Sequence, residues 1–472
     1  MFNVCSTMNT YIFVVLILVF RMFLASGEYI IELSGSKRIQ TVSSRFCSFT
    51  LDTIEMTKNS DRYDFNSIRL KNLAKALGPS YLRVSGTAVD YTLFDEVKPG
   101  KRIFKKETFD GLNKLVKEAG WSLIFGVNLQ HRKNGHWDPS NAIKLFKYTI
   151  EKGYHVAGWE LGNEPGQYYK RNETLAPDVI SRDYDRIKTI LDSIPEMKPY
   201  LLIGPDVGDI KALEPIMKAG AYHSLDVVTY HQYYVHGDTA EVDNFYNIHV
   251  MESVKFISQM ALDISHRNGG KPVWLGETSS ASGGGAKGIS DRYVAGFLWL
   301  DKLGKLATMG VKGVFRQELA GGIYTLLDTD WRPRPDYWLT VLYKRLVGTV
   351  VLSPPTPPPY SRVFVQCTNR ANSYGYNPGS VTVMVLNLRD TNMNFKLGSM
   401  ADKMVELYML TPGSQSGLLS KTVKLNGKEL FLVNDEDLPP LLPRKQKGDW
   451  IAVAALSFGF IVIPDANHRD CL

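Results

Sequence analysis

Eight short apolar runs, separated by amphipathic stretches, occupy the first three quarters of this chain of 472 residues. The runs cover residues 46–51, 81–84, 122–127, 157–161, 200–204, 226–230, 272–276 and 312–316. Between them, helical periodicity is clearest at 65–77, 107–119, 139–152, 250–267 and 290–309. Strands that alternate with helices form a parallel sheet, and eight such units in about 300 residues predict an α/β fold, a (β/α)8 TIM barrel.

The pattern changes beyond residue 350. Five prolines within residues 354–359 exclude both a regular helix and a central strand there. Short β-like runs follow at 362–366, 381–388, 404–410, 430–433 and 458–463, which predict a C-terminal all-β sandwich domain. We therefore expect a signal peptide (1–27), an N-terminal strand that pairs with the β domain (28–45), the barrel (46–348) and the β sandwich (349–472).

The N-terminus indicates export. Residues 11–25 are mostly apolar, which fits the core of a signal peptide and is short for a membrane span of about 20 residues. Small residues follow, so we expect cleavage near Gly27 and a secreted protein of the extracellular matrix or the lysosome. The first ten residues contain no Lys or Arg, which leaves a retained membrane anchor as the alternative.

Composition narrows the class of protein. With 44% hydrophobic and 22% charged residues, the chain is neither disordered nor collagen-like. Removal of Cys5 with the signal peptide leaves three cysteines, enough for one disulfide and one free thiol. Asn172 begins a glycosylation sequon, as expected of a secreted glycoprotein. The nine histidines are scattered, and no motif indicates a metal, a cofactor or nucleic acid.

Two glutamates follow strands on the same side of the expected barrel. Glu164 comes after the fourth strand, in a segment that reads Trp-Glu-Leu-Gly-Asn-Glu-Pro, and Glu277 comes after the seventh. Active sites of such barrels lie at the carboxyl ends of the strands. Glycoside hydrolysis needs a pair of carboxyl groups, one protonated and one ionised. The alternative, that each glutamate only caps a helix or pairs with a surface lysine, is common for a single Glu but less plausible for this pair.

Polar neighbours fit the same chemistry. The amide of Asn163 can donate to a sugar 2-hydroxyl. His231 and Tyr233, after the sixth strand, can reach a nucleophilic carboxylate and fix its charge, although core packing is the alternative for both. Arg83, at the end of the second strand, can bond that carboxylate or form a salt bridge at the barrel mouth.

The net formal charge is only +7, so the position of the basic residues matters more than their number. Many follow the strands and should therefore face the same side as the two glutamates. They are Lys98, Lys101, Arg102, Lys105, Lys106, Arg132, Lys133, Lys170, Arg171, Lys211 and Lys287. A positive rim attracts a sulfated or carboxylated polymer. For each residue taken singly, an ordinary solvated side chain is the alternative.

These motifs resemble family 79 of the glycoside hydrolases, the heparanase family. The resemblance rests on residues 159–165, 204–208, 273–285, 297–304, 335–339 and 418–427. It implies that Glu164 is the proton donor and Glu277 the nucleophile. It places the substrate along Asp52, Thr87, Asn163, His231, Tyr233, Gly283, Gly284, Gly322 and Tyr324, with the two adjacent glycines offering N–H groups to a uronate carboxylate. It also implies a disulfide between Cys367 and Cys471, which leaves Cys47 as a buried thiol.

Three departures from the family pattern matter. Mammalian members excise a linker peptide, whereas here residues 101–106 run almost directly into the helix at 107–119, which predicts a single-chain enzyme with an open cleft. Asp238 stands where vertebrate members have a cleft arginine, although Lys211 keeps a charge where a second one lies. Ser282 replaces a cleft tyrosine. We therefore expect a different preference for sulfation.

The function that the resemblance implies is a retaining endo-β-glucuronidase that cleaves heparan sulfate or a heparin-like glycosaminoglycan, best at acidic pH and without a cofactor or metal. Contact with membranes would arise only through heparan sulfate proteoglycans. The alternatives are an exo-β-glucuronidase, a hyaluronan-directed relative, and a non-catalytic heparan-sulfate-binding protein on the same fold.

Overall fold

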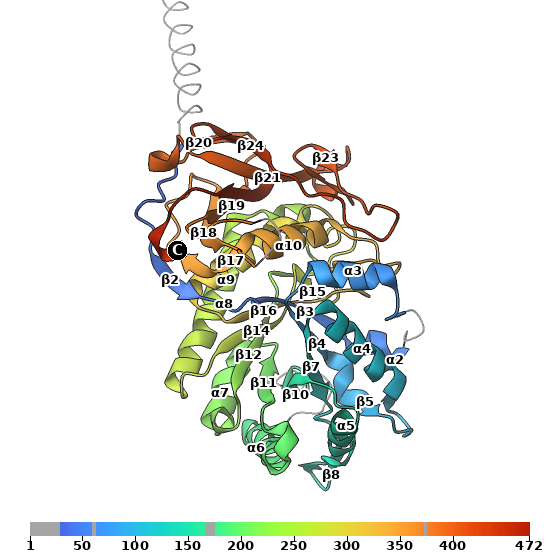
Figure 1. Cartoon of the computed structure of the whole chain (residues 1–472). Helices are drawn as coiled ribbons and strands as arrows, with labels where there is room; N and C mark the ends of the chain where they lie inside the picture. Colours follow the sequence, from blue (N-terminus) through green and yellow to red (C-terminus); the bar gives the residue numbers. More distant parts are fainter. Residues whose placement is uncertain (1–28, 59–62, 166–174, 372–374) are drawn as a thin grey trace, which may run out of the picture.

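The structure is a computed structural model that describes residues 29–58, 63–165, 175–371 and 375–472 (Figure 1). Parallel strands close into a barrel: β3 (Cys47–Asp52), β4 (Tyr81–Ser85), β7 (Ser122–Val127), β10 (Val156–Leu161), β11 (Leu201–Val207), β12 (Val227–Gln232), β14 (Val273–Thr278) and β16 (Gly313–Arg316). Pairing of Val314 in β16 with Cys47 in β3 completes the ring. Each of the eight apolar runs is therefore a barrel strand, and the predicted TIM-barrel fold is confirmed.

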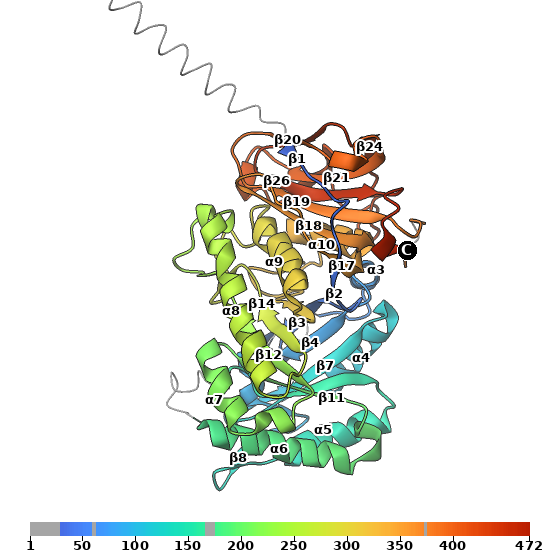
Figure 2. The same ribbon diagram turned by 90° about the vertical axis from the view of Figure 1, so that its left-hand side faces the viewer.

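Helices surround the ring (Figure 2). They are α2 (Thr53–Lys58), α3 (Ile68–Ala76), α4 (Lys106–Ala119), α5 (Ser140–Glu151), α6 (Pro177–Ser193), α7 (Leu213–Lys218), α8 (Ile248–Arg267), α9 (Ala295–Met309) and α10 (Pro335–Leu346). Helix α4 illustrates why they form where they do. Phe109, Leu112 and Val116 recur at helical spacing and are buried, and Gly120 ends the helix in the left-handed conformation, which costs glycine little.

The C-terminal part consists of two stacked sheets. The larger one runs in the order β2 (Arg38–Thr41), β17 (Val347–Leu352), β18 (Ser361–Thr368), β19 (Val381–Asn387), β26 (Ser457–Ile463), β21 (Met404–Pro412), β22 (Val423–Leu425) and β23 (Lys428–Glu429), with β24 (Arg444–Lys447) paired to β21. The smaller one joins β1 (Tyr29–Ile30), β20 (Met393–Lys396) and β25 (Ile451–Val453). Buried side chains of both sheets, Val383 and Phe395 among them, belong to one apolar cluster, as in a β sandwich.

The N-terminal segment contributes a strand to each sheet, because β1 pairs with β20 and β2 pairs with β17. Strand β17 begins at Val347, directly after α10, so the larger sheet starts slightly before the expected boundary at 349. The run 430–433 is not a strand: only Val433 forms an isolated bridge, with Asp437. Asn434 and Asp435 adopt positive φ angles in the turn between these two bridged residues.

Helices α9 and α10 lie between the barrel and the β sandwich (Figures 1 and 2). The approach is close: a Cβ added to Gly304 of α9 would overlap the ring of Phe364 in β18. Asp301 of α9 also pairs with Arg362 of β18 at 3.1 Å.

Cys367 and Cys471 form a disulfide, and Cys47 is a buried free thiol. Within the described part of the chain, no helix is both long enough and apolar enough to span a membrane.

Candidate active site

A polar cleft of about 610 Å³ opens at the carboxyl ends of the barrel strands. Its walls are formed by Asp52, Thr87, Glu164, Gly208, His231, Gln232, Tyr233, His236, Glu277, Ser282, Gly283, Gly284, Gln317 and Tyr324. These residues come from the ends of β3, β12 and β14 and from segments that follow β4, β10, β11, β12, β14 and β16. Parallel strands of a closed barrel bring these ends together, so residues far apart in the sequence share one site.

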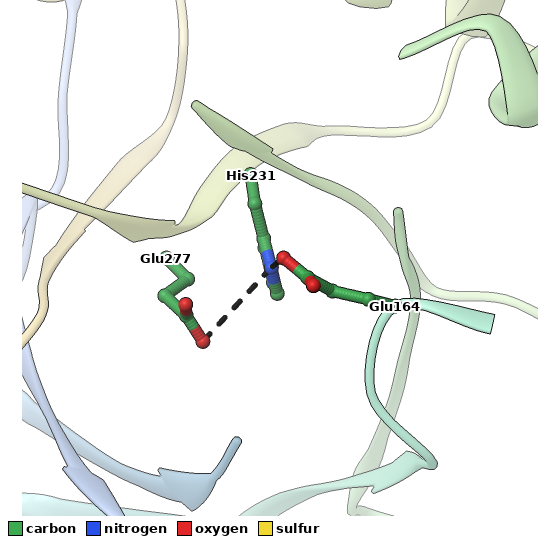
Figure 3. Close-up of side chains that lie close together, drawn as sticks. All are labelled: Glu164, His231 and Glu277. Atoms are coloured by element: carbon green, nitrogen blue, oxygen red, sulfur yellow. Dashed lines mark hydrogen bonds and ion pairs between the residues drawn. The ribbon is translucent and has the colours of Figure 1, made fainter. Parts of the chain in front are cut away.

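Glu164 and Glu277 point toward each other in this cleft (Figure 3). One carboxylate oxygen of each and a ring nitrogen of His231 all lie within 4.8 Å of one another. Glu277 belongs to β14 and is largely buried, whereas the side chain of Glu164, after β10, is 20% exposed. Two carboxyl groups at this spacing can act on a single bond of a bound substrate.

Arg83, on β4, is buried beneath the cleft and binds both of its walls. Its Nε contacts Glu160 at 2.8 Å, its Nη1 contacts Oε2 of Glu277 at 3.1 Å, and its Nη2 contacts Oδ1 of Asn163 at 3.0 Å. Burial alone would lower the pKa of Arg83, but the charges of Glu160, Asp206 and Glu277 outweigh it and raise the pKa. The guanidinium therefore stays charged and favours an ionised Glu277.

Asn163 and Tyr233 have fixed orientations. The side-chain oxygen of Asn163 accepts from Arg83, which leaves its NH2 group as the end that can donate to a substrate hydroxyl. The hydroxyl of Tyr233 donates to Oε1 of Glu277 at 2.7 Å. Burial, reinforced by the charge of Glu277, raises the pKa of Tyr233 well above its usual value, so the phenol keeps its proton and remains a donor.

His231 lies closer to Glu164 than to Glu277. Its Nδ1 lies 3.0 Å from Oε1 of Glu164 but 3.9 Å from Glu277, and its Nε2 lies 3.3 Å from Asp206. Burial alone would lower the pKa of His231, but the charge of Glu277 and the bonds to Asp206 and Glu164 raise it to about 10. These contacts favour the imidazolium form of His231.

The spacing of Glu164, His231 and Glu277 would in geometry suit a metal ion. Arg83 already supplies a positive charge to Glu277. A metal ion would also have to displace the proton that the neighbouring acidic groups hold on His231. Without a metal, the same three side chains are arranged for acid–base chemistry.

A glycine turn forms the opposite wall of the cleft. Gly283, Gly284 and Gly285 have φ angles of 71°, 87° and 99°. Successive N–H groups in such a turn can surround an anion. Strands β13 (Val235–His236) and β15 (Ala281–Ser282) pair beside it, and the ring of His236 lies against Gly283.

Two further carboxyl groups lie next to each other, that of Asp52 in the cleft wall and that of the buried Glu318. Oε2 of Glu318 accepts a hydrogen bond of 2.9 Å from the backbone N–H of Asp52. Burial, with the charge of Glu277 added, raises the pKa of Asp52 to about 7. Burial and the charge of Asp52 likewise raise the pKa of Glu318. Near neutral or acidic pH this part of the cleft is therefore less negative than its composition suggests.

Nine of the sequence-predicted residues line the cleft: Asp52, Thr87, Glu164, His231, Tyr233, Glu277, Gly283, Gly284 and Tyr324. Arg83 and Asn163 lie beneath it. Lys211 is exposed in a short 3-10 helix (Ile210–Ala212), and Gly322 lies beside Glu318; neither belongs to the lining. Sequence reasoning missed Glu160, Asp206, Gly208, Gln232, His236, Gln317 and Glu318. Their one shared signal is that each is at or near the end of a barrel strand.

The basic rim is less uniform than its sequence positions indicate. Lys101 and Arg102 line a second groove, of about 370 Å³, that shares Asp52 and Thr87 with the cleft. Lys106 pairs with Asp95 at 3.0 Å, and Arg132 pairs with Asp183 at 2.7 Å, so these two cations are neutralised. Lys170, Arg171 and the sequon at Asn172 lie outside the described residues.

Comparisons with known proteins agree with this geometry. The sequence model of the glycosyl hydrolase family 79 N-terminal domain matches residues 31–304. Mouse heparanase is 34% identical, with 94% of each chain covered. Hyaluronoglucuronidase of Hirudo nipponia is 35% identical, with 86% of this chain and 91% of that protein covered. The solved 4-O-α-L-rhamnosyl-β-D-glucuronidase of Fusarium oxysporum shares the fold, with a TM-score of 0.67, 16% identity, and 92% of this chain and 100% of that chain covered.

Proposed function

The chain belongs to family 79 of the glycoside hydrolases, and from this premise we propose that it is a retaining endo-β-glucuronidase that cleaves heparan sulfate. It is a glycoside hydrolase of the glucuronidase type by its relatives. The observation that carries the finer proposal is the spacing of Glu164 and Glu277, whose nearest oxygens lie within 4.8 Å. Retaining glycosidases have carboxyl groups about 5–5.5 Å apart, whereas inverting enzymes need a wider gap to admit water.

The reaction proceeds in two steps. Glu277, held ionised by Arg83, attacks the anomeric carbon while Glu164 gives its proton to the leaving oxygen, and the glycosidic bond breaks. A water molecule, deprotonated by Glu164, then releases the glucuronate from Glu277. His231 stabilises the carboxylate that Glu164 becomes after the first step. One glutamate must be protonated while the other is ionised, which predicts an acidic optimum.

The cleft offers contacts for a uronate chain. The N–H groups of Gly283 and Gly284 would bind the carboxylate of the reacting glucuronate, and the NH2 group of Asn163 would bind its 2-hydroxyl. The groove beside Lys101 and Arg102 would hold a further anionic unit of the same chain. A cleft that continues into a second groove favours an endo-acting enzyme over one that removes single terminal sugars.

The test is size-exclusion analysis of heparan sulfate after incubation at about pH 5. Wild type, Glu277→Gln and Glu164→Gln are compared. Fragments of intermediate size from wild type alone support the proposal, and proton NMR of the new reducing end should show the β-anomer first. An early α-anomer would contradict retention, monosaccharide alone would indicate an exo-enzyme, and an intact polymer with heparin still bound would indicate a binding protein.

Hyaluronan is the second candidate substrate. Among the described residues that line the cleft, none is lysine or arginine, so the walls near the two glutamates offer little to sulfate groups. The similarity to a hyaluronoglucuronidase points the same way. A parallel incubation with hyaluronan decides between the two substrates. If fragments form from hyaluronan and none form from heparan sulfate, hyaluronan is the substrate.

We also propose that residues 1–27 are a signal peptide, that the enzyme is secreted or lysosomal, and that Asn172 is glycosylated. Residues 1–28 and 166–174 lie outside the described part of the chain. Edman sequencing of secreted protein should begin near Glu28. Glycosidase treatment should remove one glycan. A reducing gel should show one band, because the sequence lacks the linker that mammalian members of the family excise. A membrane-bound product, or two stable subunits, would contradict this proposal.

A further inference from the structure

Asp206, near the end of β11, is connected to Glu164 in two ways, directly through the backbone and indirectly through His231. Its backbone carbonyl accepts a hydrogen bond of 3.0 Å from the N–H of Glu164. Its carboxylate lies 3.3 Å from Nε2 of His231, whose Nδ1 lies 3.0 Å from the carboxylate of Glu164. Both the main chain and the side chain of Glu164 are therefore connected to a residue of the neighbouring strand.

The backbone is unusual at both ends of this connection. Glu164 has a φ angle of 52° and Asp206 one of 53°. Residues other than glycine rarely adopt this left-handed conformation, which is strained and persists only when the surroundings enforce it. The hydrogen bond between the two residues is one such constraint, because it joins the two strained peptides directly.

The charges around His231 identify what the carboxylate of Asp206 does. The acidic groups around the imidazole are Asp206, Glu164, Glu277 and, farther away, Glu160. The opposing cation is Arg83, 3.6 Å from Asp206. Burial alone would raise the pKa of Asp206, but Arg83 and His231 outweigh it and lower the pKa, so this fully buried side chain is ionised. It is the anion that bonds Nε2 of His231, whereas Glu164 bonds Nδ1.

We propose that Asp206 is a positioning residue that orients Glu164 and keeps His231 positively charged beside it. The imidazolium then stabilises the carboxylate formed when Glu164 donates its proton. This inference rests on the proposed role of Glu164 as proton donor. Asp206 itself does not line the cleft and acts only through its two neighbours.

The substitution Asp206→Asn separates charge from shape. The amide retains an oxygen that can accept from Nε2 of His231, but it removes the negative charge. Without a stable imidazolium, the carboxylate formed on Glu164 loses the neighbouring positive charge that stabilises it, which disfavours release of the proton. We expect the descending limb of the pH profile of kcat/KM to move up by about one pH unit. We also expect kcat/KM at the wild-type optimum to fall by about 10- to 100-fold.

Asp301→Asn is the matched control, because it makes the same change at a fully buried aspartate that faces the β sandwich. It should leave the shape of the activity profile unaltered. Thermal unfolding and circular dichroism establish that both variants are folded. A folded Asp206→Asn enzyme with the wild-type pH profile would overturn the inference even if its rate were lower, since a purely structural role lowers the rate without moving the limb.

A measurement on the wild-type protein covers the case in which Asp206→Asn fails to fold. Nitrogen-15 NMR of the histidine side chains should show His231 with a proton on both ring nitrogens at about pH 8. A neutral tautomer there would overturn the inference. If wild type cleaved no glucuronide but His231 were charged, the proposed function would fail while the charge pairing stood, so the two failures are distinguishable.

Discussion

The hydroxyl of Tyr233 donates a hydrogen bond of 2.7 Å to Oε1 of Glu277, and Arg83 binds the other oxygen of the same carboxylate. Each oxygen of the proposed nucleophile therefore has a donor of its own, one neutral and one charged. The neutral donor holds the attacking group in place, and the charged donor favours its ionised state. The two contributions can be separated by substitution.

Tyr233→Phe should lower kcat/KM by about 10- to 100-fold, because one hydrogen bond to a charged group is lost. Stability should change little, since the ring can remain stacked on Tyr324. Initial rates on heparan sulfate or hyaluronan, with thermal unfolding alongside, test this prediction. An unchanged kcat/KM would mean that the hydrogen bond does not position Glu277.

Arg83→Met should destabilise the fold itself. The change leaves the carboxylates of Glu160, Asp206 and Glu277 without their shared cation, and removing one partner of a buried ion pair typically costs about 3–5 kcal/mol. Denaturant unfolding measures the free energy. The control is Arg182→Met, which breaks an exposed pair with Asp178 and should cost about 1 kcal/mol or less. Equal losses for both variants would contradict the prediction.

The sequence predicted the barrel well because its strands are buried on both faces and read as continuous apolar runs. The same reasoning placed Glu164 and Glu277, since strand ends converge in a closed barrel. It could not place Asp206 against His231, because the pairing of β11 with β12 shifts register between Gly204 and Val207. That irregularity, and the left-handed conformation of Asp206, decide which side chains meet and leave no mark on hydrophobic periodicity.

Two cations of the predicted positive rim are neutralised by acidic partners, and the sequence could not show this for a related reason. Cations were assigned to the catalytic face from chain position alone, but Lys106 and Arg132 meet acidic side chains there. Asp95 and Asp183 come from other segments, and only the folded chain brings these partners together. The net charge near a cleft thus depends on ion pairs between distant segments, and the position of each cation along the chain does not reveal them.

The stability of Asp301→Asn relative to wild type should rise with pH. Burial raises the pKa of Asp301 from 3.8 to about 6 in the folded state. Between these values the folded protein holds a proton that the unfolded chain has lost, so wild-type stability contributed by this group falls with rising pH. Asparagine does not titrate, and the other groups are common to both proteins. The melting temperature of the variant minus that of wild type should therefore become more positive from about pH 4 to pH 7. A constant or shrinking difference would contradict this prediction.

Asp238→Arg should strengthen binding of sulfated chains. Asp238 follows β13 beside the cleft, its side chain is 90% exposed, and its carboxylate lies 3.7 Å from the ring of His236. The substitution changes the local charge by two units, from one that repels sulfate to one that attracts it. We expect KM for heparan sulfate to fall by about threefold or more at low salt, and the effect to shrink as salt screens it.

The control is Asp192→Arg, which makes the same charge change in the last turn of α6. That end of the helix is remote from the carboxyl ends of the barrel strands. Both variants gain the same net charge, so both should be retained longer on a cation exchanger. Only Asp238→Arg should lower KM for heparan sulfate, and neither should change KM for unsulfated hyaluronan by as much. Equal effects on KM from both variants would show that net charge, rather than the cleft wall formed by His236 and its neighbours, controls the preference for sulfation.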